Sequence, residues 1–435
     1  MLENLEKRIK RQVHGKLHRF TAVVPLGFEA TLVQELRQIG VAAKDDSFET
    51  ADGKVSFSAK ITDAWKAVAH SRIANRILMD FASFKAENFC ELEKKADEIP
   101  WELYLPQDAP LQIHVTCKHS RLYHSDAVAE RFYDVIKGGS LPLVRTASLS
   151  TPSAGTPRNT PQYLYVSLLD DRCTVSLDLA GEELYKRGHQ RFVNDAPLKE
   201  TIAAAMLFEA FEILRLRATH SAQDDTKSFP RITLIDPMAG SGTFSLEAAY
   251  MTSGLIPGKC RDFALKHQPA FKEATWNYLV NSEFGVLNSE LRTITTSDIS
   301  DKAVKIIRHN VECSPLTKIE PALIDPQQKD FFSYTPEEIS NIGHDTSNGS
   351  RNARVIIVLN PPYGKRLDAN APKLYADIGK KLSEFKDCVV AILAPKGACT
   401  ENLLKNCAAL GLSGTKLIKT SHGGISLNCF IGKIF

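Results

Sequence analysis

The stretch ITLIDPMAGSGTFSLEAA, residues 232–249, combines an apolar strand, a turn with two glycines and the start of a helix. Asp236 closes the strand, and Gly240 and Gly242 lie in the turn. Glycine lets a ligand approach the backbone closely, and parallel α/β sheets bind ligands at the carboxyl ends of their strands. The stretch therefore predicts a binding crevice at the end of one strand of a parallel sheet.

Strands and helices continue to alternate beyond this stretch, which is typical of a doubly wound, mainly parallel sheet. The fold class predicted for this part of the chain is therefore α/β and Rossmann-like. A final hairpin is expected near the C-terminus, after strands at residues 293–298, near 321–324, at 355–360 and at 389–394 and helices at 300–312 and 371–385.

The N-terminal half also mixes strands and helices. A strand that begins at Phe20 leads through a Pro-Gly turn into a helix, and residues 162–180 alternate like a hairpin that turns at Asp170 and Asp171. A polar connector then precedes a helix led by Pro197. The connector predicts a boundary between two α/β regions.

Composition describes an ordinary globular protein of 435 residues, 43% of them hydrophobic. A formal net charge of +3 neither indicates nor excludes a nucleic-acid partner. The nine cysteines form no C-x-x-C pair and no zinc-like cluster, so we expect reduced thiols, no metal and a cytoplasmic protein. No apolar run approaches the roughly 18 residues that cross a bilayer, so no membrane partner is expected.

The glycine turn does not match the common phosphate-binding motifs. A dinucleotide-binding turn has a third glycine, where this chain has Ser245, and a P-loop has a lysine after its second glycine. Asp236 would also repel a pyrophosphate and suits an amino group better. Asp298 closes the next strand, either to bind a ribose diol or to cap the following helix. Asp330 either binds an adenine amino group or is an ordinary loop acid.

The most specific signal is VIIVLNPPYGKRL, in which an apolar strand ends in Asn360, Pro361, Pro362 and Tyr363. The Oδ1 atom of Asn360 and the carbonyl of Pro361 are two acceptors that could orient an exocyclic amino group. Tyr363 offers a flat face on which a base can stack. A turn without any function is the alternative interpretation.

The run DPMAGSGTF (236–244) followed by NPPYGKRL (360–367) resembles the class I S-adenosylmethionine-dependent methyltransferases that modify exocyclic amines of nucleobases. The wider context is similar to the THUMP-containing RNA guanine-N2 methyltransferases, which act on 23S rRNA or tRNA. That context consists of PLGFEATLVQEL (25–36), SRIANRIL (71–78), SLDLAGEELYKRGHQR (176–191) and APLKETIAAAML (196–207).

The resemblance covers nearly the whole chain and implies an α/β protein in several parts. Only one glycine turn and one N-P-P-Y occur, so the fused second methyltransferase domain of some 23S rRNA enzymes is not expected. The implied parts are a basic N-terminal extension at 1–20, a ferredoxin-like piece at 21–70, a THUMP RNA-binding domain at 71–181, a linker at 182–196 and a Rossmann-like methyltransferase domain at 197–435.

Carried over by position, the resemblance also implies roles for single residues. The target base would be held by the candidate catalytic residues Asn360, Pro361, Pro362 and Tyr363. The candidate cofactor contacts, all toward S-adenosylmethionine, are Asp236, Ala239, Gly240, Gly242 and Thr243 at the methionine end, Asp298 at the ribose and Asp330 at the adenine.

RNA contacts are expected at two basic clusters outside this site. The alternatives are ordinary surface positions for the first cluster and domain-interface packing for the second. The clusters are Lys118, Arg121 and Tyr123, and Lys186, Arg187 and Arg191.

We therefore expect an RNA methyltransferase that transfers a methyl group from S-adenosylmethionine to N2 of a guanosine in 23S rRNA or tRNA. N6 methylation of adenine in RNA or DNA is the near alternative, because N-P-P-Y serves either amine. A nicotinamide-dependent oxidoreductase with an accessory domain and a catalytically silent RNA-binding factor are alternatives from other classes.

Overall fold

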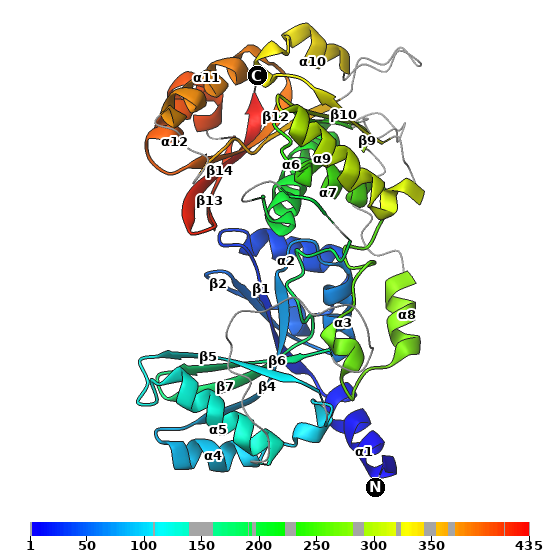
Figure 1. Cartoon of the computed structure of the whole chain (residues 1–435), viewed down its shortest axis with the longest axis vertical. Helices are drawn as coiled ribbons and strands as arrows, with labels where there is room; N and C mark the ends of the chain where they lie inside the picture. Colours follow the sequence, from blue (N-terminus) through cyan, green and yellow to red (C-terminus); the bar gives the residue numbers. More distant parts are fainter. Residues whose placement is uncertain are drawn as a thin grey trace.

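The computed structural model describes residues 2–107, 109–138, 160–189, 191–193, 197–221, 232–281, 291–318, 323–342, 354–363, 370–412 and 414–434. These residues form two seven-stranded sheets, one from each half of the chain, stacked along the long axis of the molecule (Figure 1). The α/β class expected from the sequence is confirmed.

The C-terminal sheet has the order β10-β9-β8-β11-β12-β14-β13. Its first five strands are parallel, and β14 runs antiparallel to both β12 and β13. The strand order reverses between β8 and β11, which is where doubly wound sheets bind ligands. The strands are β8 (Ile232–Asp236), β9 (Leu291–Asp298), β10 (Ile324–Gln328), β11 (Arg354–Leu359), β12 (Cys388–Pro395), β13 (Lys416–His422) and β14 (Ile425–Ile434).

Helices cover both faces of this sheet. Along β11, Ile356 and Val358 pack in the core shared with α6 and α7, while Ile357 and Leu359 pack in the core shared with α11 and α12. This two-sided burial explains why the central strands are apolar throughout. The helices are α6 (Glu200–Ser221), α7 (Thr243–Thr252), α8 (Glu273–Asn281), α9 (Asp301–Glu312), α10 (Pro336–Ile342), α11 (Ala371–Glu384) and α12 (Ala398–Asn406).

The predicted elements of this half are present, and the structure adds three helices that were not among them, α8, α10 and α12. The strand expected near residues 321–324 begins at Ile324 and extends to Gln328. Helix α12 was not anticipated, because its nine residues follow β12 with no capping residue other than Gly397.

The N-terminal sheet has the order β2-β3-β1-β4-β7-β6-β5. Strand β4 pairs with both β1 and β7, so the strands of the two expected N-terminal domains form one continuous sheet. The division into a ferredoxin-like and a THUMP unit stays a prediction. The elements are α1 (Leu2–Ile9), β1 (His18–Val23), α2 (Glu29–Gln38), β2 (Phe48–Ala51), β3 (Lys54–Ala59), α3 (Ile61–His70), β4 (Arg76–Lys85), α4 (Phe89–Asp97), β5 (Leu111–Lys118), α5 (Ser125–Lys137), β6 (Gln162–Leu169) and β7 (Arg172–Asp178).

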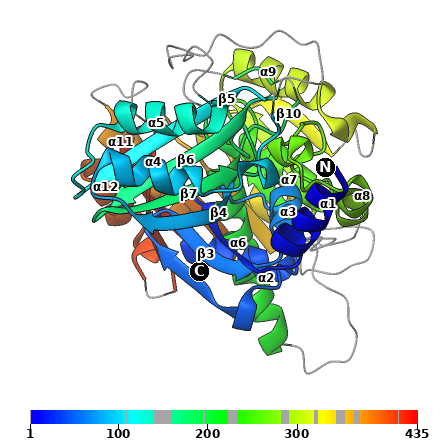
Figure 2. The same ribbon diagram turned by 90° about the horizontal axis from the view of Figure 1, so that it is seen from below.

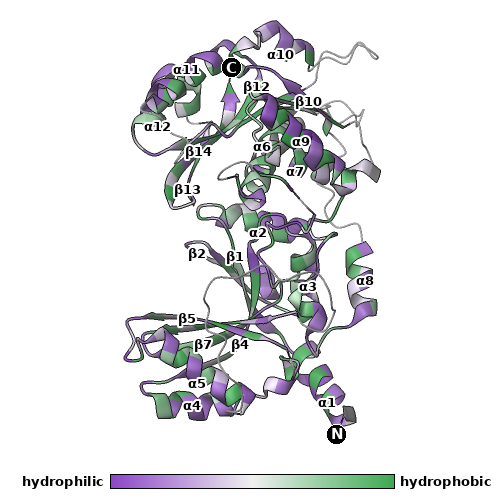
Figure 3. Ribbon diagram, in the orientation of Figure 1, coloured by the Kyte–Doolittle hydropathy of each residue, from purple (hydrophilic) through white to green (hydrophobic). Residues whose placement is uncertain are grey.

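The hairpin of β6 and β7 turns at Asp170 and Asp171, as predicted, and both residues have positive φ angles of 49° and 61°. Helices α4 and α5 cover one face of this part of the sheet, and Figure 2 shows them from below, in front of the strands. Both helices combine hydrophilic and hydrophobic residues, as surface helices do (Figure 3).

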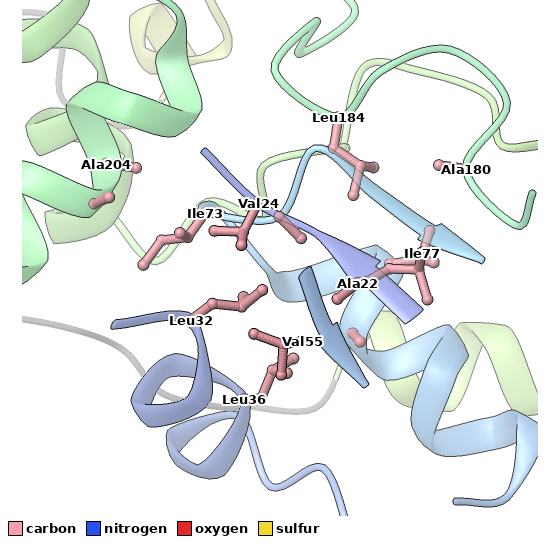
Figure 4. Packing of buried hydrophobic residues seen from close by; sticks show 14 of the residues in the cluster. Ala22, Val24, Leu32, Leu36, Val55, Ile73, Ile77, Ala180, Leu184 and Ala204 are labelled. Carbon is pink, nitrogen blue, oxygen red and sulfur yellow. The ribbon is translucent and has the colours of Figure 1, made fainter. Parts of the chain in front are cut away.

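Apolar residues connect the two halves of the chain. Leu32 of α2 and Ile73 pack near Ala204 of α6, within one core that extends from the N-terminal sheet to α7 (Figure 4). Within this interface the guanidinium of Arg187 forms a two-point ion pair with Glu247, at 2.9 and 3.0 Å. Arg187 also donates to the carbonyl oxygens of Leu184 and Arg72 at 2.9 Å each.

Replacing Arg187 with Met should lower the free energy of unfolding by about 3 kcal/mol, because the buried carboxylate of Glu247 loses its two-point partner and keeps only the longer contact with Arg72, at 3.9 Å. The Glu247 side chain is only 1% exposed. Urea denaturation followed by circular dichroism measures the change. The control is Lys186→Met, which breaks an exposed pair with Glu182 and should cost less than about 1 kcal/mol. Equal losses for the two variants would contradict the role of the buried pair.

Candidate active site

A cavity of about 560 Å³ opens at the carboxyl ends of β8, β9 and β11, beside the point where the strand order reverses. This volume is in the usual range for small-molecule sites. The cavity brings together seven of the predicted site residues: Ala239, Gly240, Thr243, Asp298, Asp330, Asn360 and Pro362.

The glycine turn requires left-handed backbone angles, with φ of 58° at Gly240 and 79° at Gly242. A Cβ atom at Gly242 would lie 3.0 Å from Cγ2 of Ile307, so this position also needs glycine for packing against α9. The Oδ2 atom of Asp298 accepts a hydrogen bond from the amide of Gly240 at 2.9 Å. The acid thereby connects the end of β9 to the turn.

Asp298 does not cap α9, which was one of its two expected roles. The cap is Ser300, whose side chain accepts from the amide of Ala303. The Oδ1 atom of Asp298 accepts from the amide of Ser300 at 2.9 Å, and the carboxylate lines the cavity. Asp330 caps the short helical turn after β10 by accepting from the amide of Phe332 at 3.0 Å, and it too lines the cavity.

Asp236 is completely buried at the end of β8. Its Oδ2 atom accepts hydrogen bonds from the hydroxyl and the amide of Ser245, at 2.8 and 3.3 Å. Its Oδ1 atom has no hydrogen-bond partner within the described part of the chain. Burial raises the pKa of Asp236 to about 7, and the negative charge of Asp298 adds to this effect. The arrangement leaves one acceptor for a buried donor.

The exit of β11 supplies a second acceptor of this kind. The Oδ1 atom of Asn360 is buried, and no partner for it exists among the described residues. Pro362 lines the cavity and Pro361 is buried. Tyr363 was expected to offer an open aromatic face to a base, but its side chain is only 7% exposed and packs edge-to-face on His422. Its hydroxyl lies 3.2 Å from Nδ1 of His422.

Apolar residues of the cavity were missed in the sequence. Ile299 and Phe332, which are 67% and 37% exposed, line it beside the two acids. Ile299 directly follows Asp298, the last residue of β9, and Phe332 comes two positions after Asp330 in the turn beyond β10, so their spacing from these acids could have indicated them. Pro197 and Leu198, which follow the connector, also line the cavity.

The predicted RNA contacts lie outside the cavity. Two of them, Arg187 and Arg191, have largely covered side chains and are not on the surface where RNA could reach them. Arg187 is 4% exposed and is held by Glu247, so the interface-packing alternative applies to it. The Arg191 side chain is 9% exposed and pairs with Glu200. Its Nη2 atom donates to Oγ1 of Thr243 at 3.0 Å and to Oγ of Ser241 at 3.3 Å, so it supports the glycine turn.

The other four predicted RNA contacts lie on the surface. Lys118 ends β5, Arg121 pairs with Glu87, and Tyr123 is 69% exposed. Lys186 is exposed and pairs with Glu182. Their contact with RNA stays a prediction.

Two further properties concern the described residues as a whole. They contain no group of three or more His, Cys, Asp or Glu side chains arranged to hold a metal ion. None of the helices they form is long and apolar enough to span a membrane.

Known proteins resemble this chain over most of its length. A protein from Allochromatium vinosum named "Ribosomal RNA large subunit methyltransferase K/L" is 29% identical over 84% of this chain and 46% of its own length. The chain thus spans about half the length of this relative. "Putative RNA methyltransferase YpsC" from Bacillus subtilis is 26% identical over 95% of this chain and 96% of its own.

The fold also has solved counterparts. The crystal structure of SMU.472 in complex with SAH aligns with a TM-score of 0.72 and 24% identity, covering 97% of this chain and 99% of that one. The family model described as the RlmL ferredoxin-like domain matches residues 19–78. The model described as the RMKL-like methyltransferase domain matches residues 187–416. Because this second match takes in more than half of the sequence, including the whole glycine turn and the N-P-P-Y exit, the chain belongs to the RMKL-like methyltransferase domain family.

Proposed function

We propose that the chain is an RNA methyltransferase that transfers the methyl group of S-adenosylmethionine to the exocyclic N2 of a guanosine in 23S rRNA or tRNA. One observation carries the proposal: two buried acceptors, Oδ1 of Asp236 and Oδ1 of Asn360, lie at the ends of adjacent strands and have no partner among the described residues. Asn360 lines the cavity, and Asp236 directly precedes Pro237, which also lines it. A buried acceptor without a hydrogen-bond partner lowers the stability of the protein, and a bound ligand that donates an N–H group to each acceptor would remove this cost.

The donor set around the cavity fits S-adenosylmethionine. Asp236 would accept from the ammonium group, Asp298 from the ribose hydroxyls and Asp330 from the adenine amino group. Ile299 and Phe332 would cover the apolar faces of the adenine. When bound, the cofactor supplies a methyl group on a positively charged sulfur. SAH in the SMU.472 structure, which has the same fold, supports this assignment.

Asn360 and Pro361 would orient the amine of the target base. Their oxygens would accept its two N–H groups and so hold the nitrogen lone pair in one orientation. The cofactor would supply the methyl group: formation of the C–N bond would be matched by cleavage of the C–S bond with its electron pair left on sulfur, and the amine would then release a proton to water. Orientation of the amine therefore replaces general-base catalysis. A base must be unpaired or flipped out to reach this position.

Guanine N2 is proposed over adenine N6 because the motif order of the chain resembles that of the RNA guanine-N2 methyltransferases, and the relatives named as ribosomal RNA methyltransferases support RNA as the substrate. Mass spectrometry of nucleosides from a knockout strain tests the choice. Loss of N2-methylguanosine from rRNA or tRNA is expected, and loss of N6-methyladenine alone would overturn the base assignment. Calorimetry tests the class: we expect binding of S-adenosylmethionine and none of NAD.

Replacing Asn360 with Ala should lower the rate of RNA methylation by at least about 100-fold, because the amine loses one of its two orienting acceptors. The dissociation constant for S-adenosylmethionine should change less than about threefold. Tritium transfer to RNA and calorimetry measure the two quantities. Asn370→Ala, at an exposed helix start nearby, is the matched control and should behave as wild type. Methylation at the wild-type rate in the Asn360 variant would remove this residue from the mechanism.

Replacing Arg191 with Met should weaken S-adenosylmethionine binding about tenfold, because two charge-assisted hydrogen bonds to Ser241 and Thr243 are lost from the turn. The turnover number at saturating cofactor should change much less, since Arg191 does not line the cavity. Lys186→Met, on the same connector, is the control. An unchanged dissociation constant would show that the turn holds its shape without Arg191.

Asp236 predicts a pH effect of a definite sign. The folded protein keeps this carboxyl protonated up to about pH 7, whereas the unfolded chain releases the proton near its ordinary value of 3.8. The contribution of Asp236 to stability therefore falls as the pH rises from about 4 to about 7. Asp236→Asn lacks this loss, so its free energy of unfolding should rise relative to wild type between pH 5 and 8. A difference that does not vary with pH would contradict the raised pKa.

A further inference from the structure

The face of the N-terminal sheet opposite α4 and α5 carries a row of flat side chains. Helices α4 and α5 lie on the side of β4, β7, β6 and β5 that is farther from the C-terminal half, so the other face is turned toward that half (Figure 1). His114 of β5 is in register with Tyr165 of β6, which is in register with Ser176 of β7. The alternate residues Leu164 and Val166 are buried beneath the helices.

The rings on this face are stacked on one another. The His114 ring lies 4.9 Å from the Tyr165 ring, with 22° between their planes. It also lies 6.2 Å from the Tyr163 ring, with 4° between the planes. The guanidinium of Arg76, held by an ion pair with Asp178, sits 5.5 Å above the Tyr165 ring. We refer to Arg76, His114, Tyr163 and Tyr165 as the aromatic ladder.

The aromatic ladder is not part of the hydrophobic core. His114 is exposed and the two tyrosines are only partly buried. Burial and the charge of Arg76 lower the pKa of His114, so its imidazole is uncharged at neutral pH. Burial raises the pKa of Tyr165 to about 12, so it too is uncharged. The face thus offers neutral, preordered rings, which lose little conformational entropy when a flat ligand stacks on them.

A row of cations crosses the same face at one end of the strands. Lys118 of β5 is in register with Leu169 of β6, which is in register with Arg172 of β7, and Arg172 pairs with Lys85 of β4. Lys118 and Arg172 are exposed, and Lys85 is 66% exposed and also contacts Glu87. Four residues along a strand separate this row from His114, a distance of about 13 Å.

The acids on this face are already engaged. Asp178 is completely buried against Arg76. Asp80 accepts hydrogen bonds from Ser176 at 2.6 Å and from Thr21 at 3.1 Å. Glu87 pairs with Lys85 and Arg121, and Glu182 and Glu183, whose charges reach the two tyrosines, pair with Lys186 and Lys199. Each of these acids is matched by a cation or a hydrogen bond, and Lys118 and Arg172 add positive charge that is complementary to a phosphate backbone.

We propose that this face binds an unpaired segment of the RNA substrate, with bases stacked on the aromatic ladder and phosphates on the cation row of Lys85, Lys118 and Arg172. A duplex keeps its bases stacked inside, so it cannot offer them to the ladder, whereas a single strand can. The proposal rests on the proposed RNA methyltransferase function, because it assigns where that RNA is held.

The test measures RNA affinity by fluorescence anisotropy with the full chain. The probes are a labelled single-stranded RNA of twelve nucleotides and a hairpin duplex made from the same sequence. The double variant His114→Ser and Tyr165→Leu should raise the dissociation constant for the single strand at least tenfold and that for the duplex less than twofold. Tyr165→Phe keeps the ring and should bind as wild type. Tyr278→Leu, which removes a 71% exposed tyrosine from α8, is the control.

The cation row is tested by a salt titration. Arg172→Gln should lower the slope of log affinity against log salt by about one and weaken both probes. Lys305→Gln, an exposed lysine on α9, should leave the slope unchanged. Arg172→Gln still tests the proposal if the double variant with Tyr165→Leu fails to fold, because Arg172 lies on the surface and its replacement should not disturb folding.

Three results would overturn the proposal: unchanged single-strand affinity in a folded double variant, equal losses for single strand and duplex in that double variant, or an unchanged salt slope in Arg172→Gln. None of these assays contains S-adenosylmethionine. Failure of the proposed function would instead appear as a wild-type protein that binds no S-adenosylmethionine in calorimetry, so the two failures are distinguishable.

Discussion

The glycine turn after β8 is the constraint around which the rest of the site is organised. Its left-handed backbone leaves amide and carbonyl groups that neighbours must satisfy. The amide of Gly240 donates to Asp298 at the end of β9, and the carbonyl of Ser241 accepts from Nδ2 of Asn310 on α9 at 3.0 Å. Asn310 in turn accepts from the amide of Phe192 in the connector at 2.8 Å. One short turn thereby fixes the positions of a strand end, a helix and the connector.

Helix α7 links this turn to the boundary between the two halves of the chain. It begins at Thr243, where Arg191 supports the turn, and about one helical turn later it carries Glu247, the partner of Arg187. Glu247 also faces Arg72, whose guanidinium donates to the carbonyl of Tyr250 at 3.1 Å. The cavity and the N-terminal half of the chain therefore both contact α7, and the connector supports the turn that lines the cavity.

Local signals allowed much of the fold and the cavity to be predicted. Apolar runs such as residues 355–359 indicate strands buried on both faces, and acids or amides directly after strands meet at one sheet edge whatever their distance in sequence. Arg187 could not be placed in this way, because the connector around it is polar and Glu247 lies sixty residues downstream. Tyr363 was misjudged for the same reason, since His422 reaches it from β13. In both cases a partner distant in sequence decides burial.

The order of the strands along the chain has a consequence for synthesis on the ribosome. The N-terminal sheet, with its aromatic ladder, is complete once residue Asp178 has emerged, whereas β8 cannot pair with β11 until residues 354–357 have been made. Domains generally fold as units, with the N-terminal one first during translation. The nascent chain would thus possess the aromatic ladder while its cavity still lacked the wall that contains Asn360. For part of its synthesis the protein would therefore have the aromatic ladder but not the complete cavity.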